Sequence, residues 1–274
     1  MAETEAELDT PRVAPLDLLS PFERLAFRVL RWLNGRGYPL ARFWQIFGHF
    51  PFVSLFIGRR VVVSGAERLQ QLPPGASFLL VSNHRTFFDL FTLAWVLIGK
   101  RGLRHHVNFP VRANFFYENP LGLLFCLFFS GGSMFPPIFR QPKKRAFNAY
   151  GVQLLVEQLK EPRSMIGFHP EGTRGKGPDP YQLLPAQPGA GKLVLEARPW
   201  VVPAFVTGLT NGMASELFAN LRGKRPIHAV FGEPIDPAHW PQGSRAALQK
   251  QVADELLDRI RALQPEERAA RGRA

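Results

Sequence analysis

Short apolar segments alternate with longer helical segments over most of this chain, from about residue 60 to residue 264. Such an alternation is typical of α/β proteins, in which helices cover the faces of a mixed sheet. The segment SFLLVSN is apolar almost throughout, as expected for a central strand that is covered on both faces. The predicted strands are 61–65, 77–83, 107–111, 164–168, 200–206 and 226–231. The predicted helices are 88–99, 113–129, 145–160, 189–198, 213–221 and 244–264. We therefore predict an α/β fold with a mixed central sheet covered by helices.

A segment rich in aromatic residues precedes the alternation. A helix is predicted over 21–34, because Ser20 can cap it and Pro21 suits its first position. The segment 38–58 is interrupted by polar residues and by Pro51, whereas a membrane span needs about 20 continuous apolar residues. We predict that the two helices form a membrane-associating hairpin at the lipid interface, with arginines facing anionic lipid. The alternative is that both helices pack on the core.

A second apolar stretch, 121–139, carries no charge. Pro136 and Pro137 would break a helix that spanned a membrane there. We predict a buried helix over 121–129, followed by an extended segment.

These patterns divide the chain into four parts. The predicted parts are a disordered acidic leader at 1–19, an interfacial two-helix motif at 20–58, one large α/β domain at 59–264 and a mobile polar tail at 265–274.

The charge of the chain limits its partners. The sequence has 34 Lys and Arg against 22 Asp and Glu, a formal net charge of +12. Nucleic acid, an anionic membrane surface and a phosphorylated substrate are the candidate partners. Nucleic acid is not favoured, because the cations do not gather around aromatic residues in a recognised motif. The single cysteine, Cys126, cannot form an intrachain disulfide, and the acidic start lacks the features of a secretory signal, which favours a reduced compartment.

Several catalytic classes lack their signatures in this sequence. It has no G-x-S-x-G elbow and no G-x-G-x-x-G after a predicted strand, and GAGKL (189–193) does not complete a phosphate-binding loop. His105 and His106 are adjacent but have no Cys, Asp or Glu at ligand spacing, so no metal site is predicted.

His84 and Asp89 form the first candidate site. His84 follows a predicted strand, and Asp89 falls in the first turn of the next helix. If His84 lies just before that helix, the carboxylate can reach back to one ring nitrogen and leave the other free to accept a proton. The alternative is that both residues only cap the helix.

A cationic loop follows the predicted strand at 164–168. The segment FHPEGTRGKG (168–177) carries Thr173 and Arg174, a hydroxyl and a guanidinium that suit a phosphate. The carboxylate of Glu171 can aim the guanidinium or bind a hydroxyl of the substrate. A solvated turn is the alternative. Arg140, which ends the segment PPIFR, is a second candidate phosphate ligand.

Four segments, taken together and in their order along the chain, resemble the glycerolipid acyltransferase family typified by 1-acyl-glycerol-3-phosphate acyltransferase. NHRTFFD (83–89) is similar to its N-H-x-x-x-x-D block, and GGSMFPPIFR (131–140) to its second block. HPEGTR (169–174) is similar to its F-P-E-G-T-R block, and WVVPAF (200–205) to its fourth. The resemblance runs from about residue 60 to residue 235.

The resemblance implies a role for each matching residue. His84 is the general base and Asp89 orients it. Arg140 holds the glycerol phosphate of the acceptor, and Pro203 lies near the acyl-donor pocket. The residues assigned to acceptor binding are Glu171, Gly172, Thr173 and Arg174.

The implied reaction moves an acyl group from acyl-CoA or acyl carrier protein, as co-substrate, to the free hydroxyl of a lysophospholipid. The expected acceptor is 1-acyl-sn-glycerol 3-phosphate and the product is phosphatidic acid, with no further cofactor and no metal. The expected location is the cytoplasmic face of the cell membrane, as a peripheral or monotopic protein. The alternatives are another lysolipid or glycerol 3-phosphate as acceptor, or a non-catalytic protein that binds membranes or nucleic acid.

The sequence also departs from the family pattern. His169 stands where the family usually has Phe, Thr86 where Ser is common, and Gly175 where Ser often follows the arginine. A histidine beside the acceptor loop is either a packed substitute for the aromatic residue or a group that alters head-group selection.

Overall fold

The computed structural model describes residue 11 and residues 13–272. The chain forms two compact units, the first from Met1–Gln45 with Asn108–Gln158 and the second from Ile46–Val107 with Leu159–Ala274. The predicted division into a motif at 20–58 and one domain at 59–264 is therefore wrong. Its physical reason is that the first helix packs on residues far along the chain: the ring of Phe27 lies 5.6 Å from that of Phe135 and 5.1 Å from that of Phe147.

The second unit contains a six-stranded sheet with the order β1-β8-β7-β2-β6-β3. Strand β2 pairs in parallel with β6 and β7, and β1 pairs in parallel with β8, whereas β7 and β8 are antiparallel. The sheet is therefore mixed, as predicted. The strands are β1 (Val61–Ser64), β2 (Phe78–Ser82), β3 (His106–Asn108), β6 (Ser164–Phe168), β7 (Trp200–Thr207) and β8 (Ile227–Phe231).

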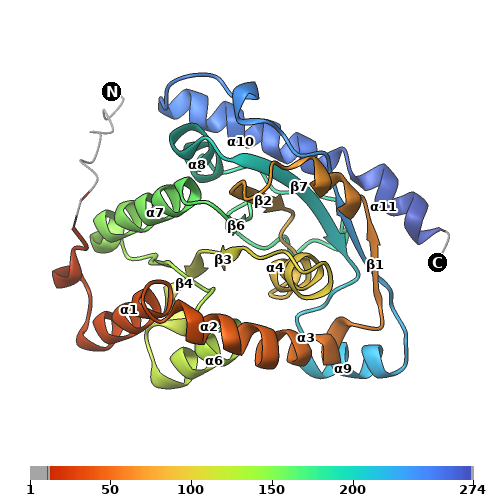
Figure 1. The fold of residues 1–274 in the computed structure, drawn as a ribbon, viewed down its shortest axis with the longest axis horizontal. Coiled ribbons are helices and arrows are strands. Elements are labelled where there is room, and N and C mark those ends of the chain that lie inside the picture. The colour runs from red at the N-terminus through yellow and green to blue at the C-terminus, as the bar shows by residue number, and fades with distance from the viewer. Residues whose placement is uncertain (1–10, 12, 273–274) are drawn as a thin grey trace. The chain divides into compact units, whose positions relative to one another are not determined.

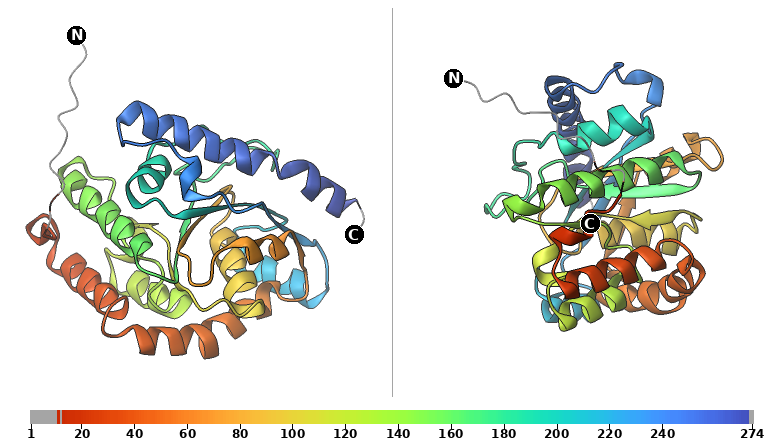
Figure 2. Two further views of the ribbon diagram at one scale, coloured as in Figure 1. Left: turned by 45° about the horizontal axis from the view of Figure 1, so that its top comes forward. Right: turned by 90° about the vertical axis from the view of Figure 1, so that its left-hand side faces the viewer.

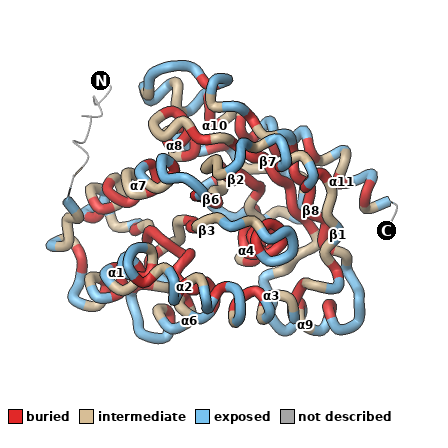
Figure 3. Tube along the Cα trace, in the orientation of Figure 1, coloured by how far each residue is buried: buried red, intermediate tan, exposed pale blue. Residues whose placement is uncertain are grey.

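Strand β2 is the central strand that the sequence predicted. All of its residues are buried, as are those of β8 and most of β7 (Figure 3). Its carboxyl end opens into the turn that carries His84.

Helices cover both faces of this sheet. Helices α8 (Gly189–Ala197) and α10 (Ala246–Arg261) lie on one face, and α4 (Asp89–Ala94), continued by a π-helical segment at Trp95–Lys100, lies on the other (Figure 1). Helix α11 (Gln264–Arg271) follows α10 almost end to end (Figure 2). The unit also contains α3 (Phe50–Ile57), α9 (Met213–Leu221) and two 3-10 helices, Ala66–Gln71 and Pro237–His239.

The first unit is mostly helical. Ser20 caps its first helix in a capping box with Glu23, whose carboxylate also pairs with buried Lys144. The helices are α1 (Pro21–Leu33), α2 (Tyr38–Trp44), α5 (Ala113–Phe116), α6 (Pro120–Ser130) and most of α7 (Arg145–Lys160), with 3-10 helices at Leu16–Leu18 and Pro142–Lys144. A two-stranded sheet joins β4 (Val111–Arg112) to β5 (Pro137–Ile138).

Both predicted ends of the chain need correction. Residues 1–10, 12, 273 and 274 lie outside the described residues, but the predicted leader ends in a 3-10 helix at Leu16–Leu18, and Leu19 is buried. The predicted mobile tail is helix α11, because buried Glu267 gives that polar segment a set of hydrogen-bond partners.

Two predicted helices are interrupted. The helix predicted over 113–129 is broken into α5 and α6, since Asn119 caps a new helix that begins at Pro120. Helix α6 matches the helix predicted over 121–129 to one residue at each end, but it is not buried throughout, because Leu121 and Leu124 are exposed. The helix predicted over 244–264 ends at Arg261, and α11 begins anew at Gln264 with a proline in its first turn.

Helices occur at both segments of the predicted N-terminal pair. Among the described residues, Tyr38–Ile57 is the one continuous helical segment that is long and apolar enough, by length and composition, to cross a membrane. It includes a π-helical turn at Gln45–His49, and 39% of its most apolar window is buried within the protein. Its association with a membrane surface stays a prediction.

Candidate active site

The site is built on the turn that follows β2. The side chain of Asn83 continues the strand pairing, because its Nδ2 donates to the carbonyl of Val206 at 2.8 Å and its Oδ1 accepts from the N–H of Val206 at 2.8 Å. Asn83 is fully buried, so these two bonds fix the turn to β7. The next residue, His84, therefore leaves the sheet from an anchored position.

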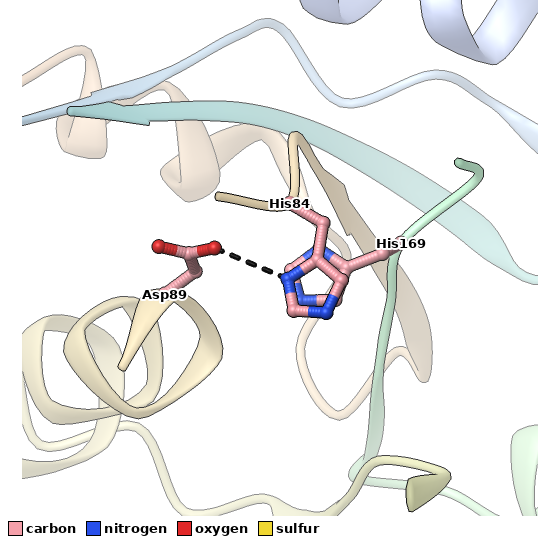
Figure 4. A group of neighbouring side chains, drawn as sticks. All are labelled: His84, Asp89 and His169. Carbon is pink, nitrogen blue, oxygen red and sulfur yellow. Dashed lines mark hydrogen bonds and ion pairs between the residues drawn. The ribbon is translucent and has the colours of Figure 1, made fainter. Parts of the chain in front are cut away.

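The structure brings His84 and Asp89 together. Asp89 is the first residue of α4, and its Oδ2 lies 3.2 Å from Nδ1 of His84 (Figure 4). The Asp89 side chain is 1% exposed, whereas that of His84 is 21% exposed. The histidine thus presents part of its ring to solvent while its partner is held inside the protein.

Asp89 also closes the turn itself. Its carboxylate accepts from the backbone N–H groups of Arg85 at 2.7 Å and Thr86 at 2.8 Å, and from the hydroxyl of Thr86 at 2.6 Å. The capping role and the dyad, which the sequence offered as alternatives, are therefore combined in one carboxylate. The threonine at position 86 keeps the hydroxyl that the family's serine would supply.

These bonds define the protonation of the dyad. Burial alone would raise the pKa of Asp89, but the hydrogen bond from His84 and the other partners hold that pKa below its ordinary value. An ionised carboxylate only accepts hydrogen bonds, so Nδ1 of His84 carries the proton. The lone pair of the imidazole is then on Nε2, which suits a general base.

The loop after β6 docks on the same turn through Glu171. One carboxylate oxygen accepts from the N–H of His84 at 2.7 Å, and the other accepts from the N–H of Leu184 at 2.7 Å. Glu171 is 1% exposed, and burial raises its pKa against the opposing effect of the two N–H donors. The structure therefore gives Glu171 a positioning role that the resemblance did not imply; its contact with an acceptor stays a prediction.

Two glycines in this loop allow close approach. Gly172 has a φ of +64°, and a Cβ there would lie 2.9 Å from Cγ of Gln187. The N–H of Gly175 donates to the carbonyl of His84 at 2.8 Å, and a Cβ at Gly175 would lie 2.9 Å from Nη1 of Arg85. A side chain at position 175 would therefore displace the guanidinium of Arg85.

The cations of the site lie at its exposed rim. Arg174 is exposed, and its Nη1 donates to Oδ1 of Asn211 at 2.9 Å. The same oxygen accepts from the N–H of Phe87 at 3.0 Å, so Asn211 connects Arg174 to the turn after His84. Thr173 is exposed beside Arg174. Asn83 and Asn211 were not predicted as site residues; the first stood inside a quoted motif, and the second carried no signal in the sequence.

The other two predicted site residues are Pro203 and Arg140. Pro203 is buried in β7, where its Cγ would lie 2.7 Å from a Cβ at Gly232. Arg140 is exposed and belongs to the first unit, whereas His84 belongs to the second. The acyl-donor role of Pro203 and the phosphate-binding role of Arg140 stay predictions.

His169, the departure from the family's phenylalanine, stacks on His84. The two ring centroids are 3.8 Å apart and the planes differ by 7° (Figure 4). One ligand atom each from His84, Asp89 and His169 lie within 4.8 Å of one another, which is close enough for a metal ion by distance alone. The in-plane lone pairs of two parallel stacked rings lie in separate parallel planes, so the two imidazoles do not converge on one ion.

The comparisons with known proteins concern this same region. A family model described as Acyltransferase matches residues 60–207, more than half of the chain. The comparison with curated proteins found no match. Among solved structures, the chain is similar to the crystal structure of the 1-acyl-sn-glycerophosphate (LPA) acyltransferase PlsC from Thermotoga maritima, with 20% identity and a TM-score of 0.49 over 92% of this chain and 85% of that chain. The family match runs through the last residue of β7 and so includes every site residue named above except Asn211.

Proposed function

Because the chain belongs to the acyltransferase family, we propose that it transfers an acyl group from an acyl thioester to the free hydroxyl of a lysophospholipid. The acceptor is 1-acyl-sn-glycerol 3-phosphate and the product is phosphatidic acid, which makes the reaction a step of phospholipid synthesis. The observation that carries the proposal is the His84–Asp89 pair, in which Asp89 holds Nδ1 and leaves Nε2 for the proton of the acceptor.

In this proposal the reaction proceeds in two steps, the formation and the collapse of a tetrahedral intermediate. Nε2 of His84 takes the proton of the acceptor hydroxyl as that oxygen attacks the thioester carbonyl carbon, and Asp89 stabilises the resulting imidazolium. The tetrahedral intermediate then collapses, the C–S bond breaks, and the departing thiolate takes the proton from His84. The products are the ester and a free thiol. General-base catalysis contributes about 10² to 10⁴ in rate, and positioning of the reactants supplies about 7–11 kcal/mol.

The charge at the rim of the site supports a phosphorylated acceptor. Arg174 uses Nη1 to bind Asn211, which orients a guanidinium whose planar fork matches a phosphate. Lys176 follows in the same loop, and the hydroxyl of Thr173 is a further donor. Arg140 stays a separate candidate for a phosphate contact.

The donor is an acyl-CoA or an acyl-acyl carrier protein. Both present a thioester carbonyl to the acceptor, and the chemistry at His84 is the same for either. In the proposal neither a further cofactor nor a metal takes part in the reaction.

We also propose that the protein acts on the cytoplasmic face of the cell membrane. Leu40, Phe43 and Phe47 are 59%, 60% and 68% exposed, and Leu121 of α6 is 79% exposed. Large apolar side chains that stand in solvent next to arginines are stabilised at a lipid interface. The first unit also holds an open apolar pocket of about 330 Å³, which suits hydrocarbon from a lipid. It is lined by Leu33, Leu40, Ala41, Trp44, Leu124, Leu127, Phe128 and Gly131.

The test is acyl transfer by the purified full chain. Labelled acyl thioesters are supplied with 1-acyl-sn-glycerol 3-phosphate, with glycerol 3-phosphate, with other lysophospholipids and with a monoacylglycerol that lacks the phosphate. We expect the highest kcat/KM for the first acceptor and a large loss without the phosphate. Failure with every acceptor would refute the proposal, and a preference for another lysolipid would correct the acceptor.

The matched variants are His84→Ala and His239→Ala. His239 is half-exposed and pairs with Glu255 on the surface, so its removal leaves the site intact. We expect His84→Ala to lower kcat by at least about 10² while His239→Ala stays near the parent value. Equal activity of the two variants would remove His84 from the mechanism.

A further inference from the structure

The imidazole rings of His84 and His169 form a parallel stack at the carboxyl ends of two paired strands. Val81 of β2 is in register with Phe168 of β6, and the chain reaches His84 and His169 soon after this pair. The ring centroids are 3.8 Å apart and the planes differ by 7° (Figure 4). The sheet therefore places one ring directly over the other.

His169 is itself fixed from the sheet. Its Nδ1 lies 3.1 Å from the carbonyl oxygen of Ser82 and 3.2 Å from Oγ of the same residue. A carbonyl oxygen only accepts hydrogen bonds, so Nδ1 of His169 carries the proton. Burial, with a further effect from His84, lowers the pKa of His169 to about 3, and the ring is therefore neutral at the pH of an assay. His169 is a neutral, flat and anchored surface.

The bond to Asp89 does not by itself hold the His84 ring in one plane. It fixes one edge of the ring, at Nδ1, and leaves tilting about that edge open. A base works well only when its lone pair points at the proton that it takes, so a tilted ring loses rate even though it remains chemically competent. A second flat ring against one face removes this tilt.

We propose that His169 is a positioning residue that fixes the plane of the His84 ring, and that it does so through its flat ring rather than through its nitrogen atoms. The inference rests on the proposed role of His84 as the base. It makes the histidine at position 169 a functional equivalent of the family's aromatic residue, and it adds the bond to Ser82 as an anchor.

Two substitutions separate the ring from the nitrogen. His169→Phe keeps a flat ring and loses the bond to Ser82. His169→Asn keeps a donor near the position of Nδ1 and loses the ring. We expect His169→Phe to retain kcat within about threefold of the parent. We expect His169→Asn to lower kcat by at least about tenfold with little change in the acceptor KM, because orientation of the base affects the chemical step more than binding.

The opposite order of the two variants would overturn the proposal, and so would equal kcat values. His169→Leu is the second variant without a flat ring, in case His169→Asn does not fold. It fills much of the same volume, and we expect its kcat to fall as that of His169→Asn does. Retention of kcat by folded His169→Leu would equally overturn the proposal.

A spectroscopic measurement tests the stack without turnover. The ring protons of His84 lie over an aromatic ring in the parent and in His169→Phe, so their NMR signals are expected upfield of those in His169→Asn and His169→Leu. If the upfield shift depends on a flat ring at position 169 but kcat does not, the positioning role is wrong while the base role of His84 stands. If His84→Ala itself retains turnover, it is the proposed function that fails.

Discussion

Each oxygen of the Glu171 carboxylate accepts a hydrogen bond from a backbone N–H, one from His84 and one from Leu184. These two residues belong to different segments, one to the turn after β2 and one to the end of the loop after β6. A single carboxylate therefore fixes the backbone of the proposed base to the loop that carries Arg174. This position requires a side chain with two hydrogen-bond acceptors, and the two oxygens of the Glu171 carboxylate provide them.

Replacement of Glu171 by glutamine removes one of those acceptors. The amide has a single oxygen, and its NH2 group then faces a backbone N–H, so one buried donor is left unpaired. We expect Glu171→Gln to lower the free energy of unfolding by about 1–3 kcal/mol and to lower kcat. Chemical unfolding and turnover measure the two effects. The matched control is Glu233→Gln, because the Glu233 side chain is 62% exposed. Equal unfolding midpoints for the two variants would contradict the positioning role.

The sequence predicted the site unevenly at this scale. The contact of His84 with Asp89 follows from local geometry, since a residue just before a helix lies near the first turn of that helix. Asn211 stands 124 residues from Phe87, and no local pattern indicates that it accepts from Phe87 and Arg174. The role of Glu171 was likewise hidden, because its partners are backbone groups.

Helix α11 holds the middle of the loop after β6. The hydroxyl of Tyr181 donates to Glu267 at 2.6 Å, and Nε2 of Gln264 donates to the carbonyl of Tyr181 at 2.7 Å. The guanidinium of Arg268 lies 3.5 Å from the centre of the Tyr181 ring. Leu184 lies three residues after Tyr181 in the chain, and its N–H donates to Glu171. The helix is thus connected to the site through one short stretch of loop.

Removal of the Glu267 side chain tests this connection. Glu267 also accepts from Thr207 and Arg271, so Glu267→Ala leaves several donors without their acceptor. We expect the free energy of unfolding to fall by about 1–3 kcal/mol and the amide of Leu184 to exchange its hydrogen faster. The control is Glu266→Ala, since that neighbour binds Arg68 near the surface. Hydrogen exchange that is the same in both variants would show that α11 does not hold the loop.

Helix α9 and strand β2 were predicted well, whereas a helix that depends on a buried polar residue and a helix start within a longer predicted helix were not. Helix α9 was predicted at its observed bounds, and β2 within one residue at each end. Residues 265–271, which form most of α11, were predicted as part of a mobile tail because only tertiary partners make Glu267 a buried residue. The break before α6 was missed because the helix predicted over 113–129 ran through Asn119 and Pro120, the cap and the first residue of α6.

The net charge and the exposed apolar side chains of the chain bear on its proposed membrane surface. In the proposed interfacial model, the formal charge of +12 favours binding to anionic lipid, and each Lys or Arg near the lipid surface contributes about 1 kcal/mol. Salt weakens such attraction, but it does not weaken the burial of side chains such as Leu121. The two contributions can therefore be measured separately.

Binding to vesicles gives this measurement. We expect the full chain to bind anionic vesicles, to bind neutral vesicles more weakly, and to lose at least about tenfold in affinity for anionic vesicles between low and high salt. We expect Leu121→Asp to weaken binding to both kinds of vesicle, because it places a charge where lipid contact is proposed. Salt-independent binding, or no effect of Leu121→Asp, would contradict the interfacial model. Cosedimentation is the readout.

The division of the chain was the part of the architecture that its sequence predicted least well. The α/β class and the mixed sheet follow from the alternation of strands and helices. The units interleave, since Asn108–Gln158 joins Met1–Gln45 across an intervening stretch of the other unit. Distance along the chain does not indicate such a pairing, because it depends on which apolar faces fit together.

The interleaving has a consequence for synthesis on the ribosome. Phe27 packs on Phe135 and Phe147, but it is made long before either of them. At about 5–20 residues per second, translation of the chain between Gln45 and Phe135 takes on the order of 5 to 20 seconds. During that time the apolar face of α1 has none of these later partners, so the nascent chain is exposed to aggregation until residues 135–147 have been made.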